Sequence, residues 1–238
     1  MGPHQRLEHH GIAGFGWGTA WVTGAGTLVT HRGARALRDD PVREELGRVT
    51  TTAALVHLRR PSKLSTVSLA DTQPFADPAG RFAFSHNGEL GDHRAYRPAY
   101  ATQGRLHGRA DAEAGARWLE DAWAASANGG RSPGELLAGL HATFGGLANL
   151  ALLLPDGSAW HYVGNDENLV IGFRLGPIRF LCTAAWSIDR SLFRLVAPGR
   201  VSGGSSARAR PPGSDRTHSD GDAGNRDVAG VAPDEQGD

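Results

Sequence analysis

Phe84-Ser85-His86-Asn87-Gly88 lies at the end of a run that begins at Arg81 and alternates between polar and apolar residues. Alternation of this kind predicts a β-strand with one buried face. Taken alone, Asn87-Gly88 favours a type I′ hairpin turn, because Asn-Gly is the strongest short-range signal for that turn. The same pair can instead present two hydrogen-bond donors to a ligand, a side-chain amide and a backbone N–H. The motifs on either side decide between these interpretations.

Four other short motifs flank this stretch in a fixed order: Gly16-Trp17-Gly18, His57-Leu58-Arg59-Arg60-Pro61-Ser62, Asp71-Thr72-Gln73-Pro74-Phe75 and, after it, Gly108-Arg109-Ala110-Asp111-Ala112-Glu113. Together the five motifs resemble those of class II glutamine amidotransferases, which have the N-terminal-nucleophile hydrolase fold. The sequence is most similar to the small free-standing members, including those that cleave a γ-glutamyl amide in ergothioneine biosynthesis. The resemblance covers most of the chain from Trp17 to Gly203.

The resemblance assigns roles to four residues. Amide hydrolysis needs a nucleophile, an oxyanion hole and a grip on the substrate. Asn87 and Gly88 match the two oxyanion-hole donors, which makes them the predicted catalytic residues. Arg59 matches the arginine that pairs with the substrate α-carboxylate, and Asp111 matches the carboxylate that binds the α-amino group. Without the resemblance, Arg59 is a surface arginine after a strand and Asp111 an acid at a helix N-terminus.

The nucleophile is where the sequence departs from the family. The family nucleophile is a cysteine exposed by removal of Met1, and its own α-amino group serves as the base. Here Gly2 follows Met1, and the single cysteine, Cys182, lies in a strand pattern that predicts a buried small hydrophobe. The segment before Gly16 is also shorter than in the family. We therefore expect the first strand to be missing, which would leave an exposed sheet edge or an open cleft.

Three hypotheses about function remain open. The chain is a glutamine amidotransferase or γ-glutamyl hydrolase whose start has been placed too far downstream, an inactive homologue that binds a glutamine-like ligand or a protein, or a decaying fragment. The first predicts hydrolysis of the side-chain amide of glutamine or a γ-glutamyl compound. In-frame DNA upstream of Met1 would discriminate between them. The chain has no synthase domain, so the expected ammonia acceptor is a separate enzyme or water.

Composition narrows the possible partners. Lysine plus arginine and aspartate plus glutamate each total 25, so the net charge gives no reason to expect nucleic acid or an anionic membrane. No apolar run approaches the roughly 20 residues of a membrane helix, and the polar start does not resemble a signal peptide. We therefore expect a cytoplasmic protein. One cysteine excludes an internal disulfide and a cysteine zinc cage, and no metal or cofactor is predicted.

The chain divides into three predicted parts. Residues 1–16 form a short N-terminal segment, residues 17–202 form the glutamine amidotransferase type-2-like domain, and residues 203–238 form a tail. From Gly203 onward there is no Phe, Trp, Tyr, Leu or Ile. Such a segment cannot bury enough apolar surface to offset the entropy of ordering, so we expect it to be disordered.

The domain itself is predicted to be α+β. Strands are expected at Trp17–Val22, Thr27–His31, Ala53–Leu58, Arg81–Ser85, Leu147–Leu154, Ala159–Val163, Leu169–Phe173 and Ile178–Thr183, and helices at Ala110–Ala125 and Ser132–His141. The family resemblance implies an αββα sandwich of two mostly antiparallel sheets flanked by helices, truncated at its N-terminus. We expect Asn87 in a loop leaving one strand, and Arg59, Asn87, Gly88 and Asp111 around one cleft.

Overall fold

The structure is a computed structural model. It describes residues 15–60, 67–126, 130–168 and 170–183, together with the backbone at 199–200 and 206–209. No helix in these residues is both long enough and apolar enough to cross a membrane.

A three-stranded sheet forms the first layer, with the order β2-β1-β3. Strands β1 (Trp17–Val22) and β2 (Leu28–Gly33) form the predicted hairpin, and β3 (Ala54–Leu58) pairs with the other side of β1. A 3-10 helix, η1 (Leu37–Asp39), and the short helix α2 (Val42–Leu46) connect β2 to β3. Val56 and Leu58 are exposed on β3, one of the two edge strands of this sheet within the described part of the chain.

The second layer is a five-stranded sheet with the order β11-β7-β6-β5-β4. Its strands are β4 (Phe75–Ala76), β5 (Ala83–Leu90), β6 (Gly146–Leu153), β7 (Ala159–Gly164) and β11 (Ser206–Ala209). A separate small sheet has the order β10-β8-β9 and contains β8 (Ile171–Leu175), β9 (Ile178–Cys182) and β10 (Gly199–Arg200). All these strand pairings are antiparallel.

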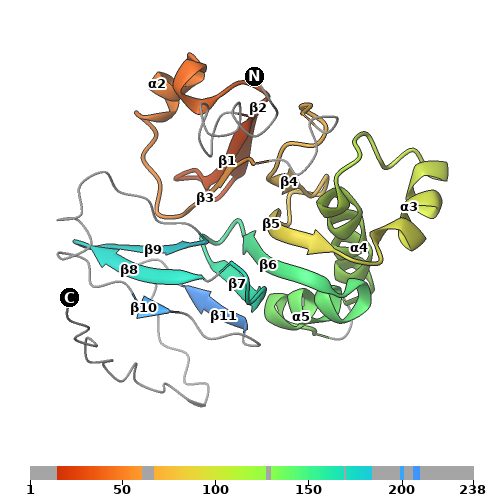
Figure 1. Cartoon of the computed structure of the whole chain (residues 1–238). Helices are drawn as coiled ribbons and strands as arrows, with labels where there is room; N and C mark the ends of the chain where they lie inside the picture. The colour runs from red at the N-terminus through yellow and green to blue at the C-terminus, as the bar shows by residue number, and fades with distance from the viewer. Residues whose placement is uncertain are drawn as a thin grey trace, which may run out of the picture.

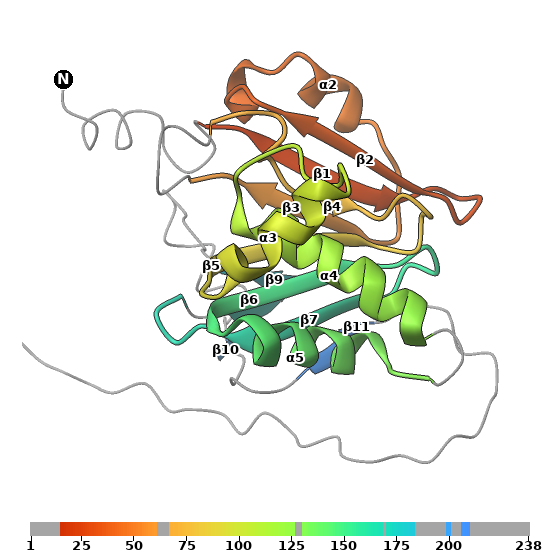
Figure 2. The same ribbon diagram turned by 90° about the vertical axis from the view of Figure 1, so that its right-hand side faces the viewer.

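Three helices, α3 (His93–Thr102), α4 (Asp111–Ser126) and α5 (Pro133–Phe144), gather on one side of the five-stranded sheet. They lie at the right of Figure 1 and face the viewer in Figure 2. Ser132 caps α5 as its sequence predicts: the side chain accepts a hydrogen bond from the backbone N–H of Glu135, whose carboxylate accepts one from the backbone N–H of Ser132.

The two faces of β5 pack against different layers of the domain. Phe84 and Leu90 belong to the large apolar cluster that α4 and α5 complete with residues such as Leu119. Ala83, which points the other way because side chains alternate along a strand, packs with Ala20 of β1. The five-stranded sheet therefore has helices on one face and the β1–β3 sheet on the other, which confirms the predicted α+β sandwich.

Two expectations about local structure are wrong. Asn87 and Gly88 do not leave a strand as a loop but lie inside β5, opposite Asn149 and Ala148 of β6. Ser206–Ala209 lies in the segment predicted to be disordered, yet it forms β11 by pairing with β7. Backbone pairing does not require the large apolar side chains on which that prediction depended. The remainder of the predicted tail, from 210 to 238, lies outside the described residues.

Candidate active site

One edge of β5 pairs with β6, and the opposite edge is covered by β4 and by the side chain of Gln73. Phe75 of β4 pairs with Phe84, and the same register places Gln73 opposite His86. There the side chain of Gln73 takes over from the backbone: its Nε2 donates to the carbonyl of His86 at 3.0 Å, and its Oε1 accepts from the N–H of His86 at 2.6 Å. This amide therefore extends the sheet by one more pair.

Asp111, the first residue of α4, occupies the other end of the same edge. Its Oδ2 accepts a hydrogen bond from the backbone N–H of Leu90 at 2.7 Å. In an antiparallel strand, alternate residues direct their backbone groups to the same side. Since His86 and Leu90 both direct their N–H groups to this edge, the N–H of Gly88 is directed there as well. No described residue accepts a hydrogen bond from it, so it is the open position between Gln73 and Asp111.

Only glycine fits at position 88. Its φ angle is +133°, and a Cβ atom added there would lie 1.8 Å from the carbonyl oxygen of Leu147. A side chain would therefore push β5 away from β6 and displace the backbone N–H. The conformation and the close approach both depend on this one residue.

Asn87 points to the other face of β5, together with Ser85 and Ala83. Ser85 Oγ lies 3.0 Å from Nδ1 of His57 on β3, so this face of β5 is directed toward the β1–β3 sheet. Asn87 Oδ1 is buried and has no hydrogen-bond partner among the described residues, and none of them accepts a bond from its amide nitrogen. The amide of Asn87 is thus held in the layer between the sheets, and no described residue bonds to its oxygen.

Arg59 follows β3 directly, and only 6% of its surface is exposed. Its backbone N–H donates to Gly16, and its guanidinium lies 3.4 Å from the carbonyl oxygen of Ser68. Burial lowers the pKa of Arg59, and the negative charge of Asp71 partly offsets this shift. A buried guanidinium whose counter-charge comes from one carboxylate can accept a second anionic group.

Asp71 connects Arg59 to the segment that precedes α4. Its carboxylate accepts hydrogen bonds from the hydroxyl of Ser68 at 2.8 Å, from the backbone N–H of Ala110 at 2.7 Å and from the backbone N–H of Arg109. Asp71 is buried and therefore fixes the position of the residue that follows Ala110, which is Asp111.

Two buried histidines in this region are held neutral. The pKa of His57 is lowered to about 4, mainly by burial, with smaller contributions from the neighbouring His86 and from the charge of Arg59. Burial also lowers the pKa of His86, although Asp111 and a hydrogen bond to Leu147 raise it. The Nε2 of His86 lies 3.1 Å from the carbonyl oxygen of Leu147 and so carries the proton, which leaves the Nδ1 lone pair 3.8 Å from Asp111 Oδ2. A cationic donor between these two atoms could bond to both.

A family model described as class-II glutamine amidotransferases matches residues 2–184, which is more than half of the chain. The chain belongs to the class-II glutamine amidotransferases. No match is found among curated protein sequences.

Two solved structures show the same fold as this class-II amidotransferase chain. The glutamine phosphoribosylpyrophosphate amidotransferase from B. subtilis, complexed with ADP and GMP, matches 87% of the chain with a TM-score of 0.60 and 16% identity. A structure described as the allosteric regulatory enzyme of purine biosynthesis matches 86% with a TM-score of 0.57 and 16% identity. The chain spans 45% and 41% of the lengths of these two proteins.

The four predicted site residues of this class-II amidotransferase chain are connected through their neighbours. Arg59 and Asn87 each lie two residues along a strand from the His57–Ser85 contact. Gly88 lies between the backbone positions bound by Gln73 and Asp111. No direct contact joins Arg59 to Asn87 or Gly88 to Asp111 among the described residues, so their arrangement around one cleft stays a prediction.

Sequence reasoning missed the residues that hold this site in place. It quoted Asp71 and Gln73 only as members of a motif and gave them no role, although Asp71 accompanies Arg59 and Gln73 closes the edge of β5. It gave no role to His86, which lies beside Asp111. The order of the motifs is the signal that could have found all three, because each lies in or next to a motif.

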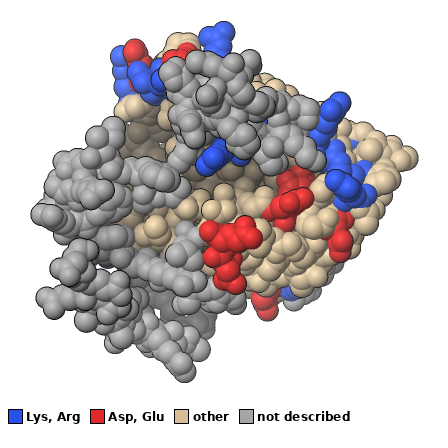
Figure 3. Space-filling model, in the orientation of Figure 1, with Lys and Arg blue, Asp and Glu red and all other residues tan. Residues whose placement is uncertain are grey.

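Charges around the class-II domain are mixed. Figure 3 shows acidic and basic side chains on the same face, and neither sign covers it. Within the described ranges, no group of three or more His, Cys, Asp or Glu side chains could hold a metal ion. Cys182 is partly exposed rather than buried as predicted, and its thiol lies 3.8 Å from the carbonyl oxygen of Ile171.

Proposed function

We propose that this domain binds glutamine or a γ-glutamyl compound at the edge of β5, with the scissile amide beside Asn87 and Gly88. The observation that carries the proposal is the backbone N–H of Gly88, open between a side-chain amide and a carboxylate that occupy the rest of the edge. A backbone donor fixed in this way can stabilise the negative charge that develops on an amide oxygen during attack. The side-chain amide of Asn87 supplies the second donor.

The two charged groups fit the ends of an amino acid. The guanidinium of Arg59 pairs with the α-carboxylate, since its fork geometry matches a carboxylate in two parallel hydrogen bonds. The α-ammonium binds Asp111, where the unprotonated Nδ1 of His86 offers a further acceptor. Family membership supports both assignments, because glutamine is the substrate after which the class is named.

Hydrolysis is a separate step from binding. The chain of 238 residues contains one thiol, that of Cys182, which has no free α-amino group beside it. We therefore expect this chain to bind its ligand but to release ammonia far more slowly than a chain with an N-terminal cysteine. Any ammonia acceptor is a separate enzyme or water. The alternative, a catalytically dead homologue that serves as a ligand- or protein-binding module, shares the same site.

Isothermal titration calorimetry with L-glutamine tests the binding step. Arg59→Gln and Asp111→Asn should each weaken binding by about tenfold or more, since each removes a charge-assisted contact. Arg60→Gln is the matched control, because Arg60 is the adjacent, exposed arginine and should bind as the unaltered protein does. Circular dichroism verifies that each variant is folded. Equal loss of binding in Arg60→Gln, or none in Arg59→Gln and Asp111→Asn, would overturn the assignment.

An ammonia-release assay on the same protein tests the hydrolytic step. The expected result is no burst of ammonia from L-glutamine. If the chain instead showed rapid hydrolysis that Asn87→Ala abolished, its nucleophile would come from a group other than an N-terminal cysteine, and the proposed slow hydrolysis would be wrong.

A further inference from the structure

A pocket of about 130 Å³ lies between β4 and the segment that leads into α4. Its walls come from five parts of the chain: β2, the segment before β4, β4 itself, the segment before α4, and α4. Its charged or polar lining residues are Thr30, Arg32, His107, Glu113 and Arg117. A pocket of this size has room for several water molecules or for one small ion with its bound waters.

The pocket has more positive than negative charge available to a ligand. Among the described residues, Glu113 is the one acidic residue in its lining, and both of its oxygens already accept hydrogen bonds: Oε1 from the backbone N–H of His107 at 2.7 Å, and Oε2 from that of Gly108 at 2.9 Å. Arg32 and Arg117 are both basic lining residues. Both residues line the same pocket, and burial lowers the pKa of Arg32, which the charge of Glu113 raises and the charge of Arg117 lowers.

Neither guanidinium is fully satisfied inside the protein. Arg32 donates from Nη1 to the carbonyl oxygen of Thr72 at 3.0 Å and lies over the ring of Phe75, but it forms no ion pair in the described part of the chain. Arg117 is 9% exposed and contacts Glu120 through Nη1 at 2.8 Å. Its buried Nε has no hydrogen-bond partner among the described residues.

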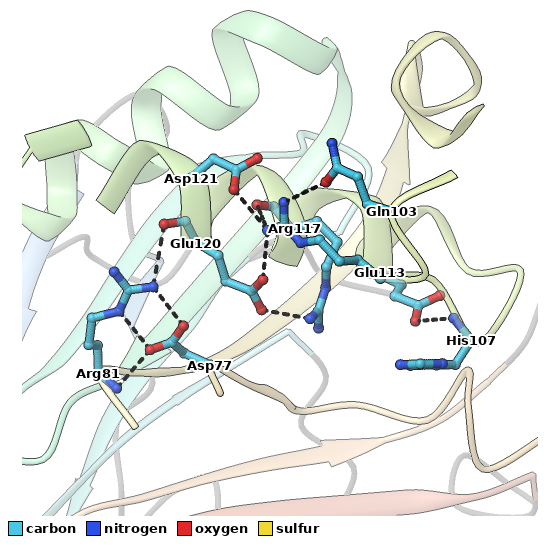
Figure 4. A network of polar contacts seen from close by, with 9 residues as sticks. Asp77, Arg81, Gln103, His107, Glu113, Arg117, Glu120 and Asp121 are labelled. Atoms are coloured by element: carbon cyan, nitrogen blue, oxygen red, sulfur yellow. Dashed lines mark hydrogen bonds and ion pairs between the residues drawn. The ribbon is translucent and has the colours of Figure 1, made fainter. Parts of the chain in front are cut away.

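The neighbouring charges leave this imbalance in place. Figure 4 shows Glu113, Arg117 and Glu120 along α4, with His107 next to Glu113. Glu120 pairs with both Arg117 and Arg105, the latter at 2.9 Å, and Arg105 also pairs with Asp121 at 2.8 Å. Glu120 is therefore shared and does not neutralise Arg117 alone. A buried donor that lacks an acceptor is costly, and an anion that accepts from both guanidinium groups would remove that cost.

We propose that this pocket is a second ligand site that binds a small oxyanion, either a free phosphate ion or the phosphoryl end of a larger molecule. Arg32 and Arg117 supply the charge, and Thr30 adds a hydroxyl donor. Oxyanion geometry suits two guanidinium groups because each can donate two parallel hydrogen bonds. The site uses no residue assigned to glutamine binding, so the two assignments can be tested independently.

The pocket and the glutamine site share one wall. Residues 107–110 donate four consecutive backbone N–H groups, two to Glu113 on the pocket side and two to Asp71 on the side of Arg59. Gly108 permits this arrangement, since a Cβ atom there would lie 2.3 Å from Asp71 Oδ1. Asp111 follows this segment directly. Residues 107–110 therefore connect an anion bound beside Glu113 to the proposed substrate contact at Asp111.

Calorimetric titration of the full chain with inorganic phosphate tests the proposal, with sodium chloride of equal ionic strength as the reference. The unaltered protein should give a saturable binding isotherm. Arg32→Gln should weaken it by about tenfold or more. Ala76→Leu keeps both arginines but fills part of the pocket, and should weaken binding similarly. Arg38→Gln is the matched control, because it removes the same charge from an exposed position and should leave binding unchanged.

A parallel titration with glycerol 3-phosphate distinguishes the two sources of the anion. Binding of inorganic phosphate alone assigns the site to a free ion, and equal or tighter binding of the ester assigns it to a phosphoryl group. The proposal is overturned if neither ligand saturates, or if Arg32→Gln and Ala76→Leu, both shown to be folded by their melting curves, bind phosphate as tightly as Arg38→Gln does.

Discussion

The two faces of β5 differ sharply although they belong to the same eight residues. On the helix side, Phe84 and Leu90 are fully buried among apolar side chains. On the side facing the β1–β3 sheet, Ser85 bonds to His57, and Asn87 keeps a buried oxygen without a described partner. The helix face is packed for stability, whereas the sheet face holds polar groups in positions where a ligand could use them.

Asn149 extends this contrast to β6. It lies directly opposite Asn87, and its Nδ2 donates to the carbonyl oxygen of Asn168 at 2.6 Å. Its Oδ1, like that of Asn87, is buried without a partner in the described residues. Two adjacent orphaned amide oxygens would be costly in a layer that served stability alone. The contrast therefore predicts that substitutions on the two faces differ strongly in their effect on stability.

The largest expected effect is on the helix face. Phe84→Ala should lower the free energy of unfolding by about 3–5 kcal/mol, because it removes a fully buried ring and leaves a cavity. Chemical denaturation measures the change. Phe180→Ala is the control, since Phe180 is 37% exposed on β9 and should cost clearly less. Equal costs would mean that the helix face does not form the main core.

An intermediate effect is expected from pH on the sheet face. The pKa of His57 is about 4 in the folded protein and near 6.5 when unfolded, so the unfolded state binds more protons between these values. The contribution of the neutral His57 to the free energy of unfolding is fully present above pH 6.5 and is lost as the pH falls toward 4. The loss attributable to His57 should reach up to about 3 kcal/mol.

Denaturation midpoints measured between pH 7 and pH 4 test this sign. His57→Gln should flatten the curve, whereas His107→Gln, which alters an exposed imidazole, should not. The lowered pKa of His86 acts in the same direction, so some slope should remain in His57→Gln. A curve that rises as the pH falls would contradict the buried neutral state of both rings.

The smallest effect on stability is expected at Asn87. Asn87→Ala removes an unpaired amide, and its free energy of unfolding should stay within about 1 kcal/mol of the unaltered protein. Asn149→Ala, which loses the bond to Asn168, should cost more and serves as the comparison. A large loss of stability in Asn87→Ala would show that this side chain supports the fold rather than a ligand.

Sequence patterns predicted most of the strands because alternation and turn residues act locally. The β1–β2 hairpin and the capping box of α5 follow directly from neighbouring residues. Helix α3 was not predicted, since Pro98 lies inside it and its burial comes from side chains such as Tyr100 that pack on distant residues. Asn87-Gly88 was assigned to a loop because its turn signal is local, whereas pairing with β6 decides the outcome.

The site was predicted only in part for a similar reason. Motif order identified Arg59, Asn87, Gly88 and Asp111, but no local pattern shows that a glutamine side chain will stand in for a strand. The pairing of Gln73 with His86 depends on the register between β4 and β5, which single-sequence reasoning does not supply. The same is true of Asp71, whose hydrogen-bond donors Arg109 and Ala110 lie 38 and 39 residues further along the chain.

The amide of Gln73 also affects whether another chain can pair with this sheet edge. An exposed sheet edge invites another chain to pair with it, because it offers a row of alternating donors and acceptors. Along β5 that row is interrupted: β4 covers Phe84, Gln73 covers His86 and Asp111 covers Leu90. A single uncovered peptide is too short to template an added strand. The edge can therefore remain open to a small molecule while excluding a neighbouring polypeptide.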